Sequence, residues 1–154
     1  SEALLNAMIA TGYKIPSKDK GIMISSGDVK EKVALLDGVR LLKNAGYTIY
    51  GTCGTAAFLN ANGVEAIPVD WPDENNPDNG NVIRMIADHM FDLIINIPKN
   101  RTKRELTNGY HIRRAAIDHN IPLITNSRLA SAFMDAITEK SLADIKIKSW
   151  QEYE

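Results

Sequence analysis

The feature that most restricts the possible folds is a repeated alternation of short apolar runs with longer segments of helical spacing. Five runs rich in β-branched and other apolar residues are expected to be strands, at residues 21–26, 47–51, 64–69, 92–98 and 121–126. Between these runs, and after the last one, lie segments in which apolar residues recur at helical spacing. This spacing predicts helices at residues 30–46, 55–63, 81–90, 110–120 and 127–138. Strands and helices that alternate in this way form right-handed crossovers. We therefore predict an α/β fold with a parallel sheet that helices cover on both faces.

Other segments depart from this alternation. Residues 3–10 have the spacing of a short amphipathic helix, and a polar linker that contains Pro16 follows them. The C-terminal sequence DIKIKSWQEYE alternates briefly between polar and apolar residues, which predicts a short extra strand. The segments 70–80 and 99–109 are rich in polar residues and are expected to be loops.

Composition narrows the classes of function. The 154 residues fit one domain with a sizeable core, and their formal net charge is -1. A net charge of this size does not favour electrostatic binding to nucleic acid or to anionic membranes. The chain has no run of about 20 apolar residues that would span a bilayer. Cys53 is the single cysteine, which excludes an intrachain disulfide and is typical of a reducing compartment, so we expect a cytoplasmic location.

Polar side chains follow the predicted strands at the edge where parallel sheets bind their ligands. These residues carry mainly hydroxyl, amide and cationic groups: Ser25, Ser26, Gly27, Asp28 and Lys30; Thr52, Gly54 and Thr55; Asp70 and Trp71; Asn96, Lys99, Asn100, Arg101, Thr102 and Lys103; Thr125, Asn126 and Ser127. Hydroxyl donors and the exposed N–H groups of helix N-termini favour phosphate or carboxylate. The pattern therefore predicts a local anion site at this edge.

Each of these residues also has a structural interpretation. A threonine before a helix is often a cap. Arg113 and Arg114 are expected to form structural ion pairs, and Cys53 to be an inert small residue. His89, His111 and His119 lie in predicted helices without the spacing of metal ligands. No phosphate-binding GxxxxGK[ST], dinucleotide-binding GxGxxG or nucleophile GxSxG motif is present.

Several stretches together resemble the methylglyoxal-synthase-like (MGS-like) domain, over roughly residues 12–138. They read GIMISSGDVKEK, YGTCGTAAFLNANGV, PVDWP, DLIINIP and GYHIRRAAIDHNIPLITN. Within this superfamily the chain is similar to the C-terminal allosteric domain of the carbamoyl phosphate synthetase large chain. The resemblance implies a three-layer α/β/α fold with a five-stranded parallel sheet. It also implies that residues 1–18 are a linker and helix from the upstream ATP-grasp half, and that residues 19–154 are the allosteric domain.

The resemblance further implies a non-catalytic domain that binds a small anionic effector: UMP or UTP, IMP, or N-acetylglutamate. Lys30 matches the effector lysine of the family if Val29 is treated as an insertion. The matching effector positions are Lys30, Thr52, Gly54, Thr55, Trp71, Asn96, Lys99 or Asn100, Thr102 and Asn108. The expected protein partners are the rest of the synthetase large chain and its glutaminase subunit. The domain itself is expected to hold no cofactor, whereas the parent enzyme would use ATP with magnesium or manganese.

Two other members of the superfamily remain as alternatives. The first is methylglyoxal synthase, which acts on dihydroxyacetone phosphate through an aspartate base. The matching turn reads PDNGN and places Asn79 at that position, although a slip of one residue would bring in Asp78. The second is the cyclohydrolase half of a bifunctional purine-pathway enzyme, which the sequence DWP does not support.

Overall fold

The computed structural model describes residues 15–71, 81–98 and 103–152, with side chains described for residues 15–71, 81–98 and 109–139. The predicted helix at residues 3–10 and most of the predicted loop at residues 70–80 lie outside the described residues. No helix that the structure describes is both long and apolar enough to cross a membrane.

The described residues form a five-stranded sheet in which every pairing is parallel. The strands are β1 (Gly21–Ser26), β2 (Thr48–Thr52), β3 (Ile67–Val69), β4 (Phe91–Ile97) and β5 (Leu123–Ile124). They lie in the order β3-β2-β1-β4-β5, so the order of strands along the chain reverses at β1. This topology confirms the predicted five-stranded parallel sheet.

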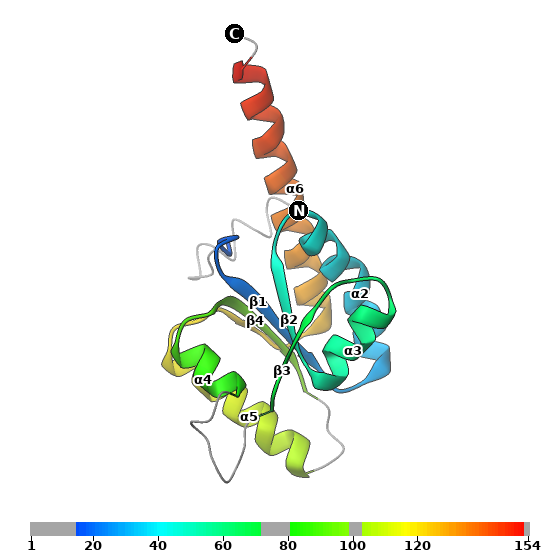
Figure 1. The fold of residues 1–154 in the computed structure, drawn as a ribbon, viewed down its shortest axis with the longest axis vertical. Helices are drawn as coiled ribbons and strands as arrows, with labels where there is room; N and C mark the ends of the chain where they lie inside the picture. The colour runs from blue at the N-terminus through cyan, green and yellow to red at the C-terminus, as the bar shows by residue number, and fades with distance from the viewer. Residues whose placement is uncertain (1–14, 72–80, 99–102, 153–154) are drawn as a thin grey trace.

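The helices cover both faces of the sheet (Figure 1) and complete a three-layer fold. They are α2 (Val29–Asn44), α3 (Cys53–Ala61), α4 (Val82–Ala87), α5 (Lys103–Asp118) and α6 (Ser127–Glu152). Helices α2, α3 and α6 lie on one face, and α4 and α5 lie on the other. The far part of α6 extends away from the rest of the domain.

The core is divided by the sheet into two layers, and strand β1 supplies both. Its alternate side chains point to opposite faces: Ile22 and Ile24 join the layer under α2, α3 and α6, whereas Met23 joins the layer under α4 and α5. All six residues of β1 are buried, as the central strand of a parallel sheet requires. Burying each such apolar side chain contributes roughly 1.5–3 kcal/mol relative to exposure.

Two predictions about secondary structure are wrong. Residues 103–109, predicted as loop, form the first turns of α5, and the predicted C-terminal strand is helix, because α6 continues to Glu152. Neither segment contains proline, and residues 127–152 contain no glycine either, so nothing in the covalent backbone ends these helices. The brief alternation in the tail is too short to outweigh the propagation of a helix that has already formed.

The strand boundaries also differ from the prediction at β3 and β5, which have only three and two residues. Strand β3 lies at the edge of the sheet, and Pro68 suits an edge because it has no N–H group to donate to a further strand. The side chain of Asn60 bonds both backbone groups of Ala66, the residue before β3. Its Nδ2 donates to the carbonyl of Ala66 and its Oδ1 accepts from the N–H of Ala66, at 2.9 and 3.0 Å.

The segment before β1 is fixed to the edge of the sheet where the strands begin. The Tyr47 hydroxyl donates to the carbonyl of Pro16 at 3.0 Å, and the N–H of Ser17 donates to Oδ2 of Asp92 at 2.9 Å. Burial raises the pKa of Tyr47 above its ordinary value of 10.0, and the Asp92 carboxylate raises it further. The Lys18 ammonium lies 5.8 Å from the centre of the Tyr47 ring. We call residues 15–20 the entry strap.

Candidate functional site

Three polar side chains lie in one row across the carboxyl ends of β2, β1 and β4. Ser25 and Asn96 are register partners in adjacent strands, and the Thr52 hydroxyl donates to Oγ of Ser25 at 3.2 Å. Each of the three is at most 3% exposed. Because the strand order reverses at β1, this row lies at the switch point where open α/β sheets bind their ligands.

A second contact brings the start of α3 into the same place. Oγ1 of Thr55 accepts the N–H of Ser26 at 3.0 Å and donates to the carbonyl of Ser26 at 3.1 Å. Oγ1 of Thr52 lies 3.4 Å from Oγ1 of Thr55. The structure therefore brings together the predicted residues Thr52, Thr55 and Asn96, with Ser25 and Ser26 between them. We call these five residues the polar row.

One hydroxyl group of the polar row, that of Ser26, differs from the others in its hydrogen bonding. Oγ of Ser26 is buried and has no hydrogen-bond partner within the described part of the chain. A buried hydroxyl without a partner costs stability, roughly 1–3 kcal/mol.

The start of α3 is not capped by a side chain. Thr52 occupies the N-cap position but its hydroxyl makes no capping hydrogen bond, so the interpretation of Thr52 as a side-chain cap is wrong. The next residues, Cys53 and Gly54, are exposed. The first N–H groups of an α-helix have no partner inside the helix and carry its positive dipole end. This turn therefore presents exposed backbone donors.

A lysine of α2 reaches the same turn, and it is not the one that the sequence indicated. A Cβ atom built on Gly54 would lie 3.4 Å from Nζ of Lys32, so the Lys32 ammonium is beside the start of α3. Lys30 is exposed on the first turn of α2, and its N–H donates to the N-cap carboxylate of Asp28 at 3.0 Å. Lys32 was not predicted, because the family resemblance points to Lys30, and the role of Lys30 stays a prediction. Residues two apart on a helix do not face the same way, so the position of Lys30 gave no signal for Lys32.

Arg113 of α5 also belongs to the site. Its Nη1 donates to Oδ1 of Asn96 at 2.8 Å. The interpretation of these arginines as members of structural ion pairs is correct for Arg114, whose Nε lies 3.3 Å from Asp118, whereas the contact described for Arg113 is with the Asn96 amide. The i, i+4 spacing of Arg114 and Asp118 was visible in the sequence, whereas the contact from α5 to β4 is not local.

Other residues of the predicted edge have different positions. Trp71 is half-buried and packs against the core layer under α4 and α5. Asn126 accepts the N–H of Leu129 at 3.0 Å and so serves the start of α6. Lys99, Asn100 and Thr102 lie outside the described residues, as does the side chain of Asn108.

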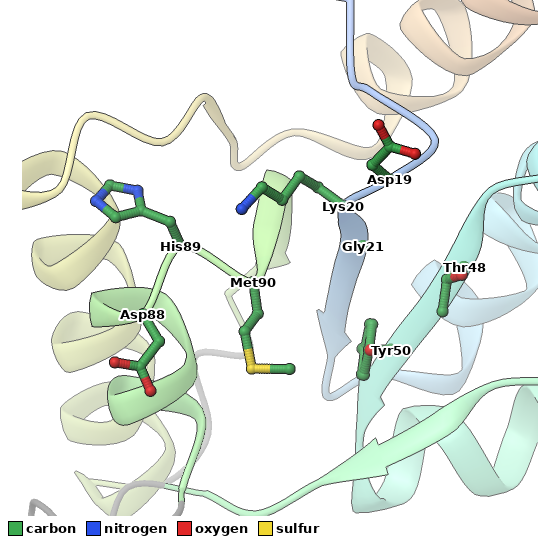
Figure 2. Close-up of a pocket in the computed structure, with 8 residues that line it drawn as sticks. All are labelled: Asp19, Lys20, Gly21, Thr48, Tyr50, Asp88, His89 and Met90. Atoms are coloured by element: carbon green, nitrogen blue, oxygen red, sulfur yellow. The ribbon is translucent and has the colours of Figure 1, made fainter.

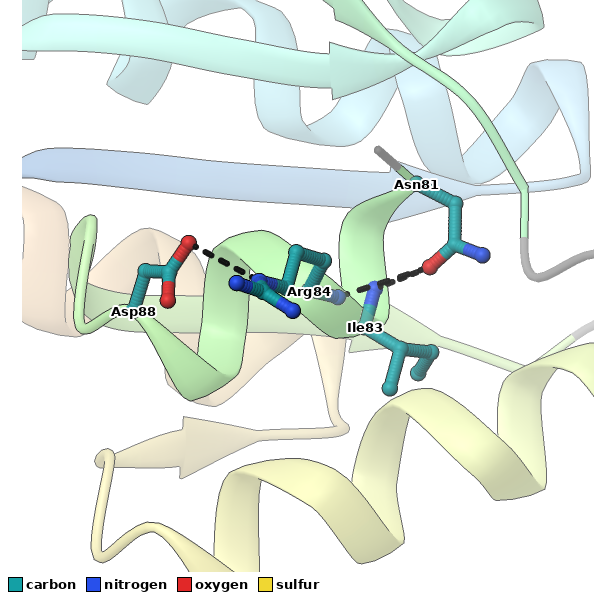
Figure 3. Close-up of polar contacts among 4 residues, drawn as sticks. All are labelled: Asn81, Ile83, Arg84 and Asp88. Carbon is teal, nitrogen blue, oxygen red and sulfur yellow. Dashed lines mark hydrogen bonds and ion pairs between the residues drawn. The ribbon is translucent and has the colours of Figure 1, made fainter. Parts of the chain in front are cut away.

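The start of α4 is fixed next to the end of β3 (Figure 3). Oδ1 of Asn81 accepts the N–H groups of Ile83 and Arg84 at 2.9 and 3.4 Å. The N–H of Val82 donates to the carbonyl of Asp70 at 3.0 Å. The Val82–Asp70 contact thereby ties the end of β3 to the start of α4.

A cavity of about 220 Å³ lies at the opposite edge of the sheet, where β1 and β2 begin (Figure 2). It is lined by Asp19, Lys20, Gly21, Thr48, Tyr50, Asp88, His89 and Met90. Lys20 of the entry strap extends toward the turn that carries His89. None of the polar-row residues lines this cavity. Within the described residues, no group of three or more His, Cys, Asp or Glu side chains could hold a metal ion.

Comparison with known proteins gives the family. Residues 34–125 match the family model of the MGS-like domain. The chain belongs to the MGS-like domain family, as its resemblance indicated. The structure is similar to that of methylglyoxal synthase from Elizabethkingia anophelis NUHP1, with a TM-score of 0.53 and 17% sequence identity over 77% of this chain and 80% of that one. At this identity the likeness shows a shared fold.

The curated relatives are much longer proteins. The chain is 39% identical over 146 residues to carbamoyl-phosphate synthase [ammonia], mitochondrial, of Homo sapiens, which covers 94% of this chain and 10% of that protein. It is 39% identical over 149 residues to multifunctional protein CAD of Squalus acanthias, and 35% identical over 159 residues to multifunctional protein URA2 of Saccharomyces cerevisiae. These matches cover 88% and 97% of this chain but 6% and 7% of those proteins. The chain thus spans a tenth or less of the length of these relatives.

Proposed function

We propose that this domain is the regulatory domain of a carbamoyl-phosphate synthase large chain and binds a small anionic effector at the polar row. The parent enzyme would make carbamoyl phosphate from glutamine or ammonia, bicarbonate and ATP, for pyrimidine and arginine synthesis. The observation that carries the proposal is the convergence of Thr52, Thr55, Ser25, Ser26 and Asn96 at the switch point of the sheet. The relatives named above support the choice of parent enzyme.

The anionic group of the effector would lie at the start of α3. Backbone N–H groups near Gly54, the dipole of α3 and the ammonium group of Lys32 all favour a phosphate or carboxylate there. Lys30 is exposed on the neighbouring turn of α2 and adds positive charge. The Asp28 carboxylate is already engaged as the N-cap of α2.

The remainder of the effector would extend along the carboxyl ends of β1 and β4. Asn96 lies on this side, and Trp71 follows β3 at the same edge and offers an aromatic surface. Lys99 or Asn100, Thr102 and Asn108 are the matching family positions and would close the far side. The hydroxyls of Thr52 and Thr55 are already hydrogen-bonded to Ser25 and to the Ser26 backbone. We therefore expect them to shape the turn and to reach the ligand only at its edge.

Binding would regulate the parent enzyme through a difference in affinity. An effector shifts an equilibrium between two states only to the extent that it binds one of them more tightly. The domain is expected to contribute no catalytic residue of its own. Uridine nucleotides, inosine monophosphate and N-acetylglutamate all carry the phosphate or carboxylate that the site favours.

The test is a thermal-shift screen of the full 154-residue chain with UMP, UTP, IMP and N-acetylglutamate. A ligand at 100 times its Kd stabilises the folded state by about 2.7 kcal/mol, which corresponds to a rise in Tm of roughly 5–10 °C for a domain of this size. We expect such a rise with at least one compound, and a smaller rise in Gly54→Glu, which places a carboxylate at the exposed start of α3.

The matched control is Thr48→Glu, which places the same charge on β2 at the opposite end of the sheet and should leave the rise unchanged. No rise with any of the four compounds would overturn the proposal. Production of methylglyoxal from dihydroxyacetone phosphate would instead establish the synthase alternative.

A further inference from the structure

The contact between Arg113 and Asn96 determines which way the Asn96 amide is turned. Asn96 is 3% exposed, and Nη1 of Arg113 lies 2.8 Å from its side-chain oxygen. A guanidinium group carries only hydrogen-bond donors, so the atom of Asn96 that faces it must be the oxygen. The amide nitrogen, which is a donor, is therefore the atom turned away from Arg113.

Arg113 is held in place by the shape of α5. A Cβ atom built on Gly109, one turn earlier, would lie 2.8 Å from Nη1 of Arg113 and 3.6 Å from its Cζ. The guanidinium group thus occupies the space that the absent side chain leaves. Arg114, the next residue, instead forms an exposed pair with Asp118. Two adjacent arginines of one helix therefore have different environments, and only Arg113 contacts the polar row.

We infer that Arg113 is a positioning residue: it holds Asn96 with the amide N–H group as the donor available to the effector. This inference rests on the proposed function. The effector then presents a hydrogen-bond acceptor, a carbonyl or carboxylate oxygen, beside β4, in addition to its anionic group at the start of α3. A charge-assisted contact such as that of Arg113 is stronger than a neutral one, and so fixes the amide firmly.

The arrangement also sets a minimum size for the effector. The backbones of Thr52 and Asn96 are separated by β1, which places them two strand spacings or about 10 Å apart. Inorganic phosphate is too small to reach from the start of α3 to Asn96. A nucleoside monophosphate or an acylated acidic amino acid carries both an anionic group and a separate carbonyl oxygen, and either class meets the two requirements.

The experiment measures affinity in the full chain by isothermal titration calorimetry, with UMP, N-acetylglutamate and inorganic phosphate as probes. Arg113→Met and Arg114→Met are matched variants, because each removes one guanidinium group from adjacent positions of α5. We expect Arg113→Met to weaken the organic probe that binds by fivefold or more and to change phosphate binding by less than twofold. Arg114→Met should leave both affinities unchanged. Arg113→Lys, which keeps the charge without the planar fork, should restore part of the affinity.

Asn96→Asp separates positioning from support of the fold. The carboxylate that this substitution introduces would still accept from Arg113, so the Tm without ligand should not fall, but the donor is lost and the organic probe should bind at least tenfold more weakly. Equal organic-probe affinities in Arg113→Met and Arg114→Met, or wild-type affinity in Asn96→Asp, would overturn the inference.

A measurement without ligand keeps the inference separate from the proposed function. In ¹⁵N NMR spectra of the free protein, Arg113→Met should shift the side-chain amide resonances of Asn96, and Arg114→Met should not. If no probe binds the wild type, the proposed function fails. An unshifted Asn96 resonance in Arg113→Met would refute the positioning role, whether or not a probe binds.

Discussion

The Thr55 hydroxyl and the Ser26 backbone hold each other through two hydrogen bonds of opposite direction. The hydroxyl accepts from the N–H group at 3.0 Å and donates to the carbonyl at 3.1 Å. The last residue of β1 is thereby joined to the first turn of α3, at a point where both are buried.

Replacement of Thr55 by valine should therefore be strongly destabilising for so small a change. Valine has nearly the same shape but leaves the N–H and the carbonyl of Ser26 buried without this partner. We expect the free energy of unfolding to fall by about 2–4 kcal/mol, since each unsatisfied buried group costs roughly 1–3 kcal/mol. Urea denaturation followed by circular dichroism measures this loss. Thr55→Ser keeps the hydroxyl and should lose less than half as much, and equal losses in the two variants would contradict the assignment.

Removal of the Asn81 cap should loosen α4 at its start. Asn81 is 1% exposed, and its side-chain oxygen is the acceptor for two N–H groups of the helix (Figure 3). We expect Asn81→Ala to reduce the free energy of unfolding by about 1–2 kcal/mol. Asn81→Asp keeps the acceptor and adds a charge that suits a helix N-terminus, so it should retain most of the stability. Hydrogen exchange at Ile83 and Arg84 provides the local measurement, and unchanged exchange in Asn81→Ala would refute the role.

The close approach of α3 to β2 requires glycine at position 51. A Cβ atom there would lie 3.0 Å from the backbone nitrogen of Ala56, which cannot move without moving the helix. We expect Gly51→Ala to cost about 1–3 kcal/mol and to weaken effector binding, because it displaces the start of α3. Gly54→Ala is the control, since its Cβ meets only the end of the flexible Lys32 side chain at 3.4 Å. Similar melting temperatures for the two variants would show that α3 is free to shift.

The Tyr47 phenol should make stability fall at alkaline pH. Its pKa is raised above 10.0 in the folded protein, first by burial and then by Asp92. Between the unfolded and folded pKa values the unfolded chain has lost the proton that the folded protein keeps, so the unfolding free energy decreases as pH rises. The contribution is fully present below about pH 10 and is lost as pH rises through the folded pKa. Urea unfolding from pH 8 to 11.5 should show a shallower decline for Tyr47→Phe than for the wild type.

The same variant has a second effect at neutral pH, where the phenol is protonated in both states. Tyr47→Phe removes the 3.0 Å hydrogen bond to Pro16 and should cost roughly 1 kcal/mol there. Parallel pH curves for the two proteins would mean that another group causes the alkaline decline.

The fold could be predicted to the extent that its determinants are local. The apolar runs around residues 21–26 and 92–98 identify the two most buried strands, and their alternation with helical segments gives the parallel sheet. Helix ends were predicted less well. The first turns of α5 and the far part of α6 consist of polar and mixed residues whose pattern alone does not distinguish helix from loop or strand. Neither segment contains proline, and α5 continues through Gly109.

The site could be predicted to the extent that it follows from strand ends. Thr52, Thr55 and Asn96 were found because the carboxyl ends of parallel strands meet at one edge. Arg113 could not be found in this way, because its partner is 17 residues away on another element. The hydrogen bonds that the threonine hydroxyls make within the protein could not be predicted either, since they depend on how closely the start of α3 approaches the end of β1.

Strand β1 connects the two ends of the domain that have been described separately. It begins directly after the entry strap, where Ser17 is bonded to Asp92, and it ends in Ser25 and Ser26 of the polar row. Its six buried residues pair with β4, and those from Gly21 to Ile24 also pair with β2, over a length of about 20 Å. Under the proposed function, we therefore expect displacement of the entry strap and effector binding at the polar row to influence each other through β1.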